Sequence, residues 1–120
     1  MLTPIAAAPA GVVALRAVGT VTTDDYDTVL TPAIEAAIMD HGSVRLVYEL
    51  GPDFKGYAAG AAWEDAKFGA SYLSKWKRCA VVTDHTLLAD AVRAFGVIMP
   101  GEIRVFPVAG LADAMAWAAA

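Results

Sequence analysis

The most restrictive feature of this sequence is a five-residue run, Cys79-Ala80-Val81-Val82-Thr83, that carries no charge on either of its alternating faces. A strand exposed on one face usually alternates between apolar and polar residues, whereas a strand covered by helices on both faces can be uncharged throughout. Strands of the second kind are typical of parallel sheets. We therefore predict that residues 79–83 form a buried central strand of an α/β domain.

Length and composition limit the remaining choices. The 120 residues suffice for one domain, and 58% of them are hydrophobic, against about 45–50% in an average soluble domain. This excess suggests an apolar pocket or partner surface. The longest uncharged run, residues 1–15, is shorter than the about 18 residues that cross a bilayer, and it lacks the basic start of a signal peptide. The net charge of −4 argues against nucleic-acid binding, and the single cysteine favours a cytoplasmic location.

Strand and helix patterns alternate along the chain. In order, they predict strands at residues 2–8, 12–22, 44–50, 79–83 and 103–106, and helices at residues 26–41, 57–70, 85–95 and 111–119. The first two strands form a hairpin, and the later alternation implies right-handed crossovers and parallel pairing. The expected fold is α/β, a single domain over residues 1–120. It has a mostly parallel mixed sheet of about five strands with an N-terminal β-hairpin, flanked by about four helices.

Local signals predict where several elements begin and end. Thr22 offers a capping hydroxyl to the first helix, and Gly42 is suited to the left-handed cap that ends it. Pro32 lies inside that helical pattern and lacks a backbone donor, so we expect either a kink or a main helix that begins near Thr31. Asp84 can cap the helix that follows the central strand.

Six residue strings follow one another along nearly the whole chain in the order of a known family. They are Asp25-Tyr26 ahead of Leu30 and Pro32, Gly42 with Val44-Arg45-Leu46, Trp63-Glu64-Asp65 with Lys67-Phe68-Gly69, Ala80-Val81-Val82 with Asp84, Glu102-Ile103-Arg104 with Phe106, and Ala114-Met115-Ala116-Trp117. Together they resemble the SpoIIAA-like family, small bacterial proteins of the wider STAS superfamily.

The resemblance implies a mixed sheet flanked by helices, with similarity to the lipid-carrying SEC14 or CRAL-TRIO domains. It also implies non-enzymatic roles, namely binding a hydrophobic ligand or associating with membranes. One departure matters. STAS proteins that antagonise anti-sigma factors carry a phosphorylatable Ser or Thr after the third strand, and residues 51–70 contain neither. A phosphate switch at that position is therefore not expected.

The sequence offers no credible catalytic or metal-binding constellation. His41 and His85 are the only histidines, and neither lies at metal-ligand spacing from the other or from Cys79. Glu64 and Asp65 are neighbours, so on a helix their side chains point about 100° apart and do not form a tight acid/base pair. We expect no enzyme activity, no metal and no cofactor.

Two connectors are richer in apolar and aromatic residues than loops usually are. The residues expected to surround or gate an apolar ligand are Trp63, Phe68, Tyr72, Trp76, Phe95, Ile98 and Met99. The residues expected to face an anionic membrane headgroup are Lys67, Lys75 and Lys77, each contributing about 1 kcal/mol near the surface. The alternative is that Trp76 folds back onto the core and that these residues are ordinary packing, with the loop at residues 97–99 either exposed or buried.

Two functions fit these observations. The first is a non-catalytic binding module for a small hydrophobic or lipid-like ligand, cytoplasmic and peripherally associated with a membrane. The second is a STAS-type interaction or regulatory domain that forms a homodimer or docks a protein partner without the phosphorylatable switch. Neither function involves a nucleic acid.

Overall fold

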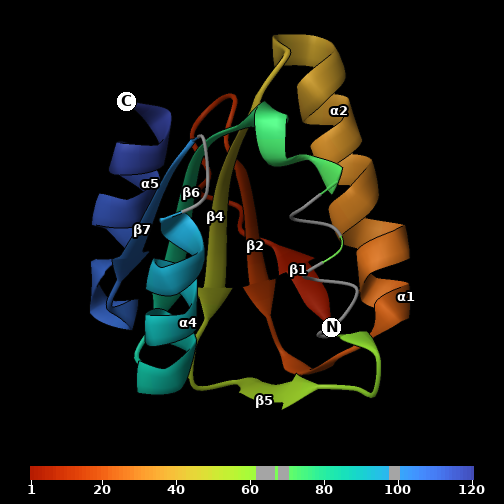
Figure 1. Ribbon diagram of the computed structural model, residues 1–120, viewed down its shortest axis with the longest axis vertical. Helices are drawn as coiled ribbons and strands as arrows, with labels where there is room; N and C mark the ends of the chain where they lie inside the picture. Colours follow the sequence, from red (N-terminus) through yellow and green to blue (C-terminus); the bar gives the residue numbers. More distant parts are fainter. Residues whose placement is uncertain (62–66, 68–70, 98–100) are drawn as a thin grey trace.

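The fold is built around a five-stranded mixed sheet (Figure 1). The computed structural model describes residues 1–61, 67, 71–97 and 101–120, except the side chains of Leu73 and Phe95. The strand order is β1-β2-β4-β6-β7. The bounds are β1 Leu2–Pro4, β2 Val13–Ala17, β4 Val44–Leu50, β6 Trp76–Thr83 and β7 Glu102–Phe106. β1 runs antiparallel to β2, and the other three neighbouring pairs are parallel.

The predicted central strand is confirmed. β6 lies between β4 and β7, and residues 79–83 are all buried. Cys79 and Val81 belong to the hydrophobic core on one face of the sheet, whereas Ala80 and Val82 belong to the core on the other face. The absence of charge on both alternating faces therefore has a direct structural cause.

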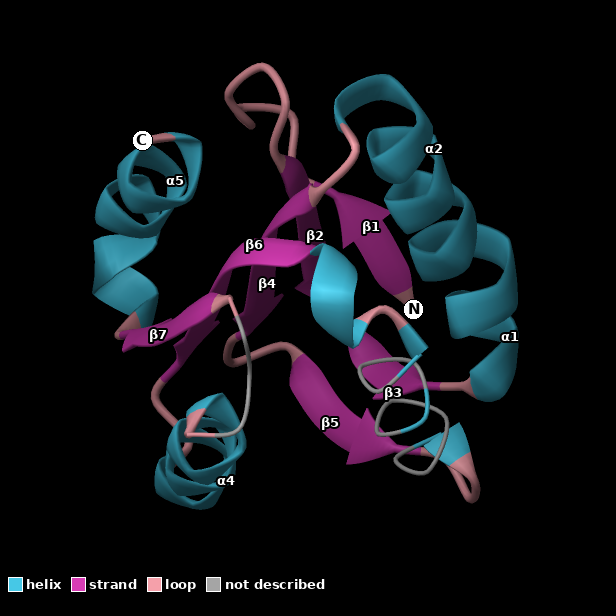
Figure 2. Cartoon of the chain, turned by 45° about the horizontal axis from the view of Figure 1, so that its top comes forward, coloured by secondary structure: helices cyan, strands magenta, loops and turns pink. Residues whose placement is uncertain are grey.

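Helices cover both faces of the sheet (Figure 2). Their bounds are α2 Thr31–His41, α4 Thr86–Gly96 and α5 Leu111–Ala119. α2 and α4 share one face, where Ile34 is fully buried in the same core as Val81. α5 covers the opposite face, where Met115 packs in the same core as Val82.

The first helical segment has three parts. α1 spans Thr23–Asp25, the π-helical η1 spans Tyr26–Leu30, and α2 follows directly. Thr22 and Asp25 form a reciprocal capping box at the start. The main α-helix begins at Thr31 with Pro32 in its first turn, as expected, and ends at Gly42, which has a left-handed φ of 74°. Proline is tolerated in the first turn of an α-helix, because the N–H that it lacks has no partner within that helix.

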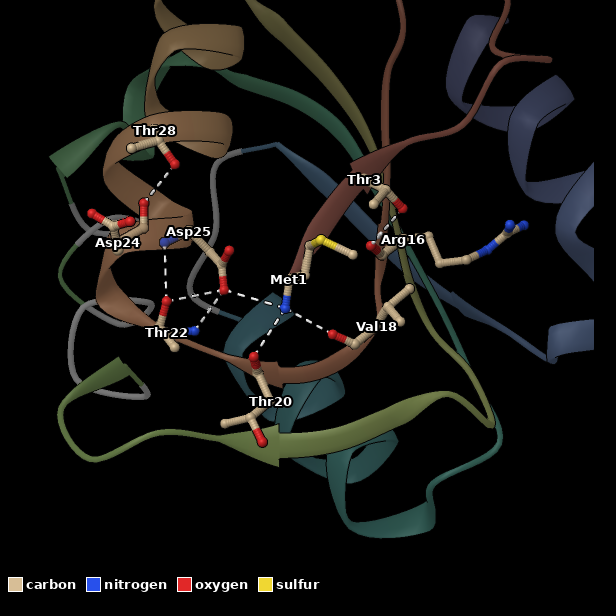
Figure 3. A network of polar contacts seen from close by, with 9 residues as sticks. All are labelled: Met1, Thr3, Arg16, Val18, Thr20, Thr22, Asp24, Asp25 and Thr28. Carbon is tan, nitrogen blue, oxygen red and sulfur yellow. Dashed lines mark hydrogen bonds and ion pairs between the residues drawn. The ribbon is translucent and has the colours of Figure 1, made fainter.

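A polar network joins the start of the chain to this helix (Figure 3). The α-amino group of Met1 donates to the carbonyl oxygens of Val18 at 2.7 Å and Thr20 at 2.9 Å, and lies 3.3 Å from the Asp25 carboxylate. Burial alone would raise the pKa of Asp25. Hydrogen bonds from Thr22 and the nearby α-amino group outweigh this effect of burial, so the pKa of Asp25 is lowered overall.

A second, two-stranded sheet corrects two predictions. β3, Gly19–Val21, pairs in parallel with β5, Phe54–Tyr57. The strand expected over residues 12–22 is therefore two strands in different sheets, and Gly19, with φ of 65°, allows the chain to turn between them. Residues 54–57 were expected to end a loop and begin a helix, but they form β5.

The α/β class and the five-stranded mixed sheet are confirmed, whereas the expected four helices and mostly parallel pairing are not matched in detail. In the ranges that the structure describes, three helices pack on the sheet when residues 23–41 are counted as one. The helix expected at residues 57–70 lies largely outside those ranges. The antiparallel β1–β2 pair makes the sheet mixed. β1 ends at Pro4, short of residue 8.

Candidate functional site

A pocket of about 230 Å³ opens at the carboxyl edge of the parallel strands. Its lining comes from the end of β4, the residues after β6 and the residues after β7. The lining residues are Leu50, Gly51, Pro52, Asp84, His85 and Val108. The carboxyl ends of parallel strands meet at one edge of the sheet, so segments far apart in sequence converge here. This edge is the usual ligand-binding position in open α/β sheets.

Hydrogen bonds hold the three strand ends together around the pocket. The Thr83 hydroxyl donates to the carbonyl oxygen of Leu50 at 2.9 Å and accepts from the backbone N–H of His85 at 3.1 Å. The backbone N–H of Val108 donates to the Asp84 carboxylate at 3.1 Å. Asp84 was expected to cap α4, and the structure instead joins it to the segment after β7. These bonds fix the lining residues relative to the sheet.

The pocket combines an apolar wall with a polar side. Leu50, Pro52 and Val108 supply aliphatic surface, whereas Asp84 and His85 are exposed polar residues. The His85 ring is held edge-on to the ring of Phe54, with centroids 6.1 Å apart. A small molecule with an apolar body and a donor group matches this lining. The volume lies below the about 300–1,000 Å³ of typical drug-sized sites, which restricts the ligand to a small one.

An ion pair with one buried partner lies next to the pocket. The side chain of Glu49 on β4 is 8% exposed and pairs with Arg16 on β2, whose side chain is 43% exposed. A Cβ atom added to Gly51 would lie 3.9 Å from Cγ of Glu49 and 3.8 Å from Cγ2 of Val108. Gly51 thus lies close to both the Glu49 side chain and Val108 of the pocket wall, and an alanine there would make ordinary contacts.

Among the described residues, no group of three His, Cys, Asp or Glu side chains is arranged to hold a metal ion. Cys79 is a buried core residue, as its place in the strand predicted. None of the helices in those ranges has both the length and the apolar character needed to span a bilayer.

The predicted headgroup lysines lie at the other end of the sheet. Lys75 ends the short 3-10 helix η2, Leu73–Lys75, and Lys77 follows in β6; both are exposed, as is Lys67. Trp76 between them is 8% exposed and packs in the core, which is the alternative considered for it. The connector was expected to continue to residue 78, but β6 already begins at Trp76.

Tyr72 is half-buried, and its hydroxyl donates to the carboxylate of Glu35 at 3.1 Å. Burial, followed by the hydrogen bond and the negative charge of Glu35, raises the pKa of Tyr72. This contact ties the segment before β6 to α2. Binding of a ligand by Tyr72 or Trp76 stays a prediction.

The other predicted ligand residues lie outside the described part of the chain: Trp63, Phe68, Ile98 and Met99, together with the side chain of Phe95. The residues on either side of 98–100 are described. Val97 is 85% exposed, and a Cβ atom on Gly101 would overlap the carbonyl group of Trp76. Gly101 therefore lies against the start of β6, close to Lys77.

The sequence pattern of the SpoIIAA-like family matches residues 12–119. The chain belongs to the SpoIIAA-like family. Among solved structures, an uncharacterised protein with a SpoIIAA-like fold from Shewanella loihica PV-4 is 30% identical. The match has a TM-score of 0.69 and covers 88% of this chain and 82% of that one. No curated protein matches the sequence.

Family membership supports the STAS-type α/β fold of this SpoIIAA-like domain. It does not show the expected kinship with SEC14 or CRAL-TRIO domains, nor a ligand. The sequence interpretation missed Leu50, Pro52 and Val108 as lining residues of the pocket. A signal was present, because each follows or ends a predicted parallel strand on the carboxyl side.

Proposed function

We propose that this SpoIIAA-like domain is a non-catalytic binding module that takes a small hydrophobic ligand at the carboxyl edge of its sheet. The observation that carries the proposal is the pocket with an aliphatic wall of Leu50, Pro52 and Val108. The kinship with lipid-carrying SEC14 or CRAL-TRIO domains that the sequence led us to expect would favour the same class of ligand.

The polar side of the pocket selects the ligand's functional group. The Asp84 carboxylate accepts a hydrogen bond from Val108 and retains acceptor capacity on its second oxygen. An amine or hydroxyl can donate to that oxygen, whereas a carboxylate would meet a like charge. Short alkyl chains therefore serve as probes, with the preference amine, then alcohol, then carboxylate.

Amide NMR titrations with n-hexylamine, n-hexanol and hexanoate test this proposal. The expected result is a shift of the Gly51, His85 and Val108 amide signals that is largest for the amine. Gly51→Ala adds a methyl group in ordinary contact with Val108, so it should weaken binding several-fold without unfolding the domain. Leu87→Ala on the exposed face of α4 is the matched control and should change nothing. Absence of shifts at these amides for all three probes would refute the proposal.

Peripheral membrane contact is a second candidate function, supported by a separate observation. Lys75 and Lys77 are exposed at the amino end of β6, and Gly101 packs against the backbone of Trp76 and Lys77. Val97, four residues before Gly101, has an exposed apolar side chain. Cations near an anionic leaflet contribute about 1 kcal/mol each. Lysine and apolar groups together suit the interface between headgroups and acyl chains.

Vesicle co-sedimentation tests this contact. Binding is expected for phosphatidylcholine vesicles that contain phosphatidylserine and not for phosphatidylcholine alone. Because the double variant Lys75→Glu/Lys77→Glu loses two attractive charges worth about 2 kcal/mol, it should bind at least about 30-fold more weakly. Lys55→Glu on β5 controls for the reversal of a lysine away from β6, with half the change in net charge. Equal binding by both variants would contradict the contact.

A further inference from the structure

The two edges of the main sheet differ in how they are protected. β1 is three residues long, contains Pro4 and contacts η1, so little of its edge is available for pairing. β7 is five residues long and lies at the opposite edge (Figure 1). In the part of the chain that the structure describes, its strand neighbour is β6. Its outer edge can therefore accept another strand.

The charges of β7 are self-complementary. Glu102 and Arg104 are both exposed and lie two residues apart, so they point to the same face of the sheet. On that face Glu102 also pairs with Arg78 at 3.3 Å, and the Arg104 guanidinium lies 6.0 Å from the centre of the Trp117 ring. An antiparallel pairing of two copies centred on Ile103 places Glu102 of each copy directly opposite Arg104 of the other. Centring on Arg104 would place two arginines face to face, so the charges favour the first register.

An exposed apolar side chain lies beside the same point. Gly96, at the end of α4, packs so closely on Ile103 that a Cβ atom there would overlap Cγ2 of the isoleucine. The next residue, Val97, is 85% exposed. A two-fold axis through Ile103 would bring Val97 of one copy near its counterpart and remove apolar surface from water.

We propose that β7 is a homodimerisation edge, where two copies pair antiparallel about Ile103 and join their five-stranded sheets. Two reciprocal Glu102–Arg104 pairs set the register, and Val97 adds apolar contact. This proposal is independent of the ligand pocket, because the residues that carry it are not among those lining the pocket.

Charge reversal tests the proposal. Sedimentation equilibrium over a range of concentrations should show a dimer for the wild type. Glu102→Arg alone and Arg104→Glu alone each place like charges opposite one another, and each should raise the dimer dissociation constant at least about tenfold. An equimolar mixture of the two variants restores opposite charges at both positions, so it should form a heterodimer with an affinity near that of the wild type.

Circular dichroism establishes that the variants are folded, and Lys55→Glu on β5 is the control for net charge. A monomeric wild type over the whole concentration range would overturn the proposal. So would a dimer whose affinity is unchanged by both single reversals, because its interface would lie elsewhere. Failure of the mixed variants to associate would refute the register centred on Ile103.

Discussion

Replacing Arg16 by methionine should destabilise the domain, because it removes the partner of a buried carboxylate. Arg16 and Glu49 are paired positions in the β2–β4 ladder, and their side chains form an ion pair. Methionine preserves much of the apolar stem of arginine but has no donor. The Glu49 carboxylate, 8% exposed, would then lose its charge-assisted hydrogen bond.

The magnitude follows from the burial of the two side chains. Removing one partner of a fully buried pair costs about 3–5 kcal/mol, whereas an exposed pair contributes about 0–1 kcal/mol. Arg16 is partly exposed and Glu49 is not, so we expect a loss of about 2 kcal/mol in the free energy of unfolding. With a urea m-value of about 1.5 kcal/mol/M, the denaturation midpoint should fall by about 1.3 M.

Urea denaturation followed by circular dichroism measures this loss. Arg93→Met is the matched control, because Arg93 pairs with Asp90 at a position where both side chains are more than 60% exposed, and it should cost less than about 0.5 kcal/mol. The double variant Arg16→Met/Glu49→Met removes the buried charge with its partner, so it should recover much of the loss. The reasoning is refuted if the midpoint of Arg16→Met stays within about 0.3 M of the wild type, or if the double variant is no more stable than the single one.

Three further changes have defined outcomes. Asp25→Asn should cost about 1 kcal/mol at neutral pH. Because the pKa of Asp25 is lowered in the folded state, the loss in free energy of unfolding should be present above about pH 4 and should disappear as the pH falls through the lowered pKa. Urea denaturation at several pH values measures this. Because the pKa of Tyr72 is raised in the folded state, the neutral phenol contributes stability below about pH 10. This contribution is lost as the pH rises through the folded-state pKa. Glu35→Gln should lower that pKa, as measured by NMR of the tyrosine ring. Gly101→Ala should cost about 3 kcal/mol in thermal unfolding, because its Cβ atom would overlap the carbonyl of Trp76; an unchanged melting temperature would contradict this.

The main sheet could be predicted because its signals are local. The absence of charge over residues 79–83 reflects burial on both faces, and the apolar spacing predicted α5 with the bounds that the structure has. The missing N–H of Pro32 predicted either a kink or a main helix that begins near Thr31, and α2 begins at Thr31. In each case the sequence signal lies within a few neighbouring residues.

Features that depend on distant partners could not be read in this way. β2 and β3 have the same strand-like pattern, and their separation depends on the positive φ of Gly19 and on pairing with β5. Trp76 lies between two lysines, as an aromatic residue at a membrane interface would, yet the pairing of β6 with β4 places it in the core. The pocket at the carboxyl edge likewise exists only because three strands end side by side.

The proposed ligand pocket and the proposed membrane contact lie at opposite ends of β6, whereas the sequence suggested a single site for both. The sequence interpretation combined an apolar ligand with a basic headgroup contact in a single site. In the structure, the exposed Lys77 lies at the amino end of β6, whereas Asp84 follows its carboxyl end in the pocket. The eight residues of β6 separate these ends by about 23 Å, at about 3.3 Å per residue. A ligand small enough for a pocket of about 230 Å³ does not reach both. Gly51→Ala should therefore weaken alkylamine binding and leave vesicle binding unchanged, while Lys75→Glu/Lys77→Glu should do the reverse.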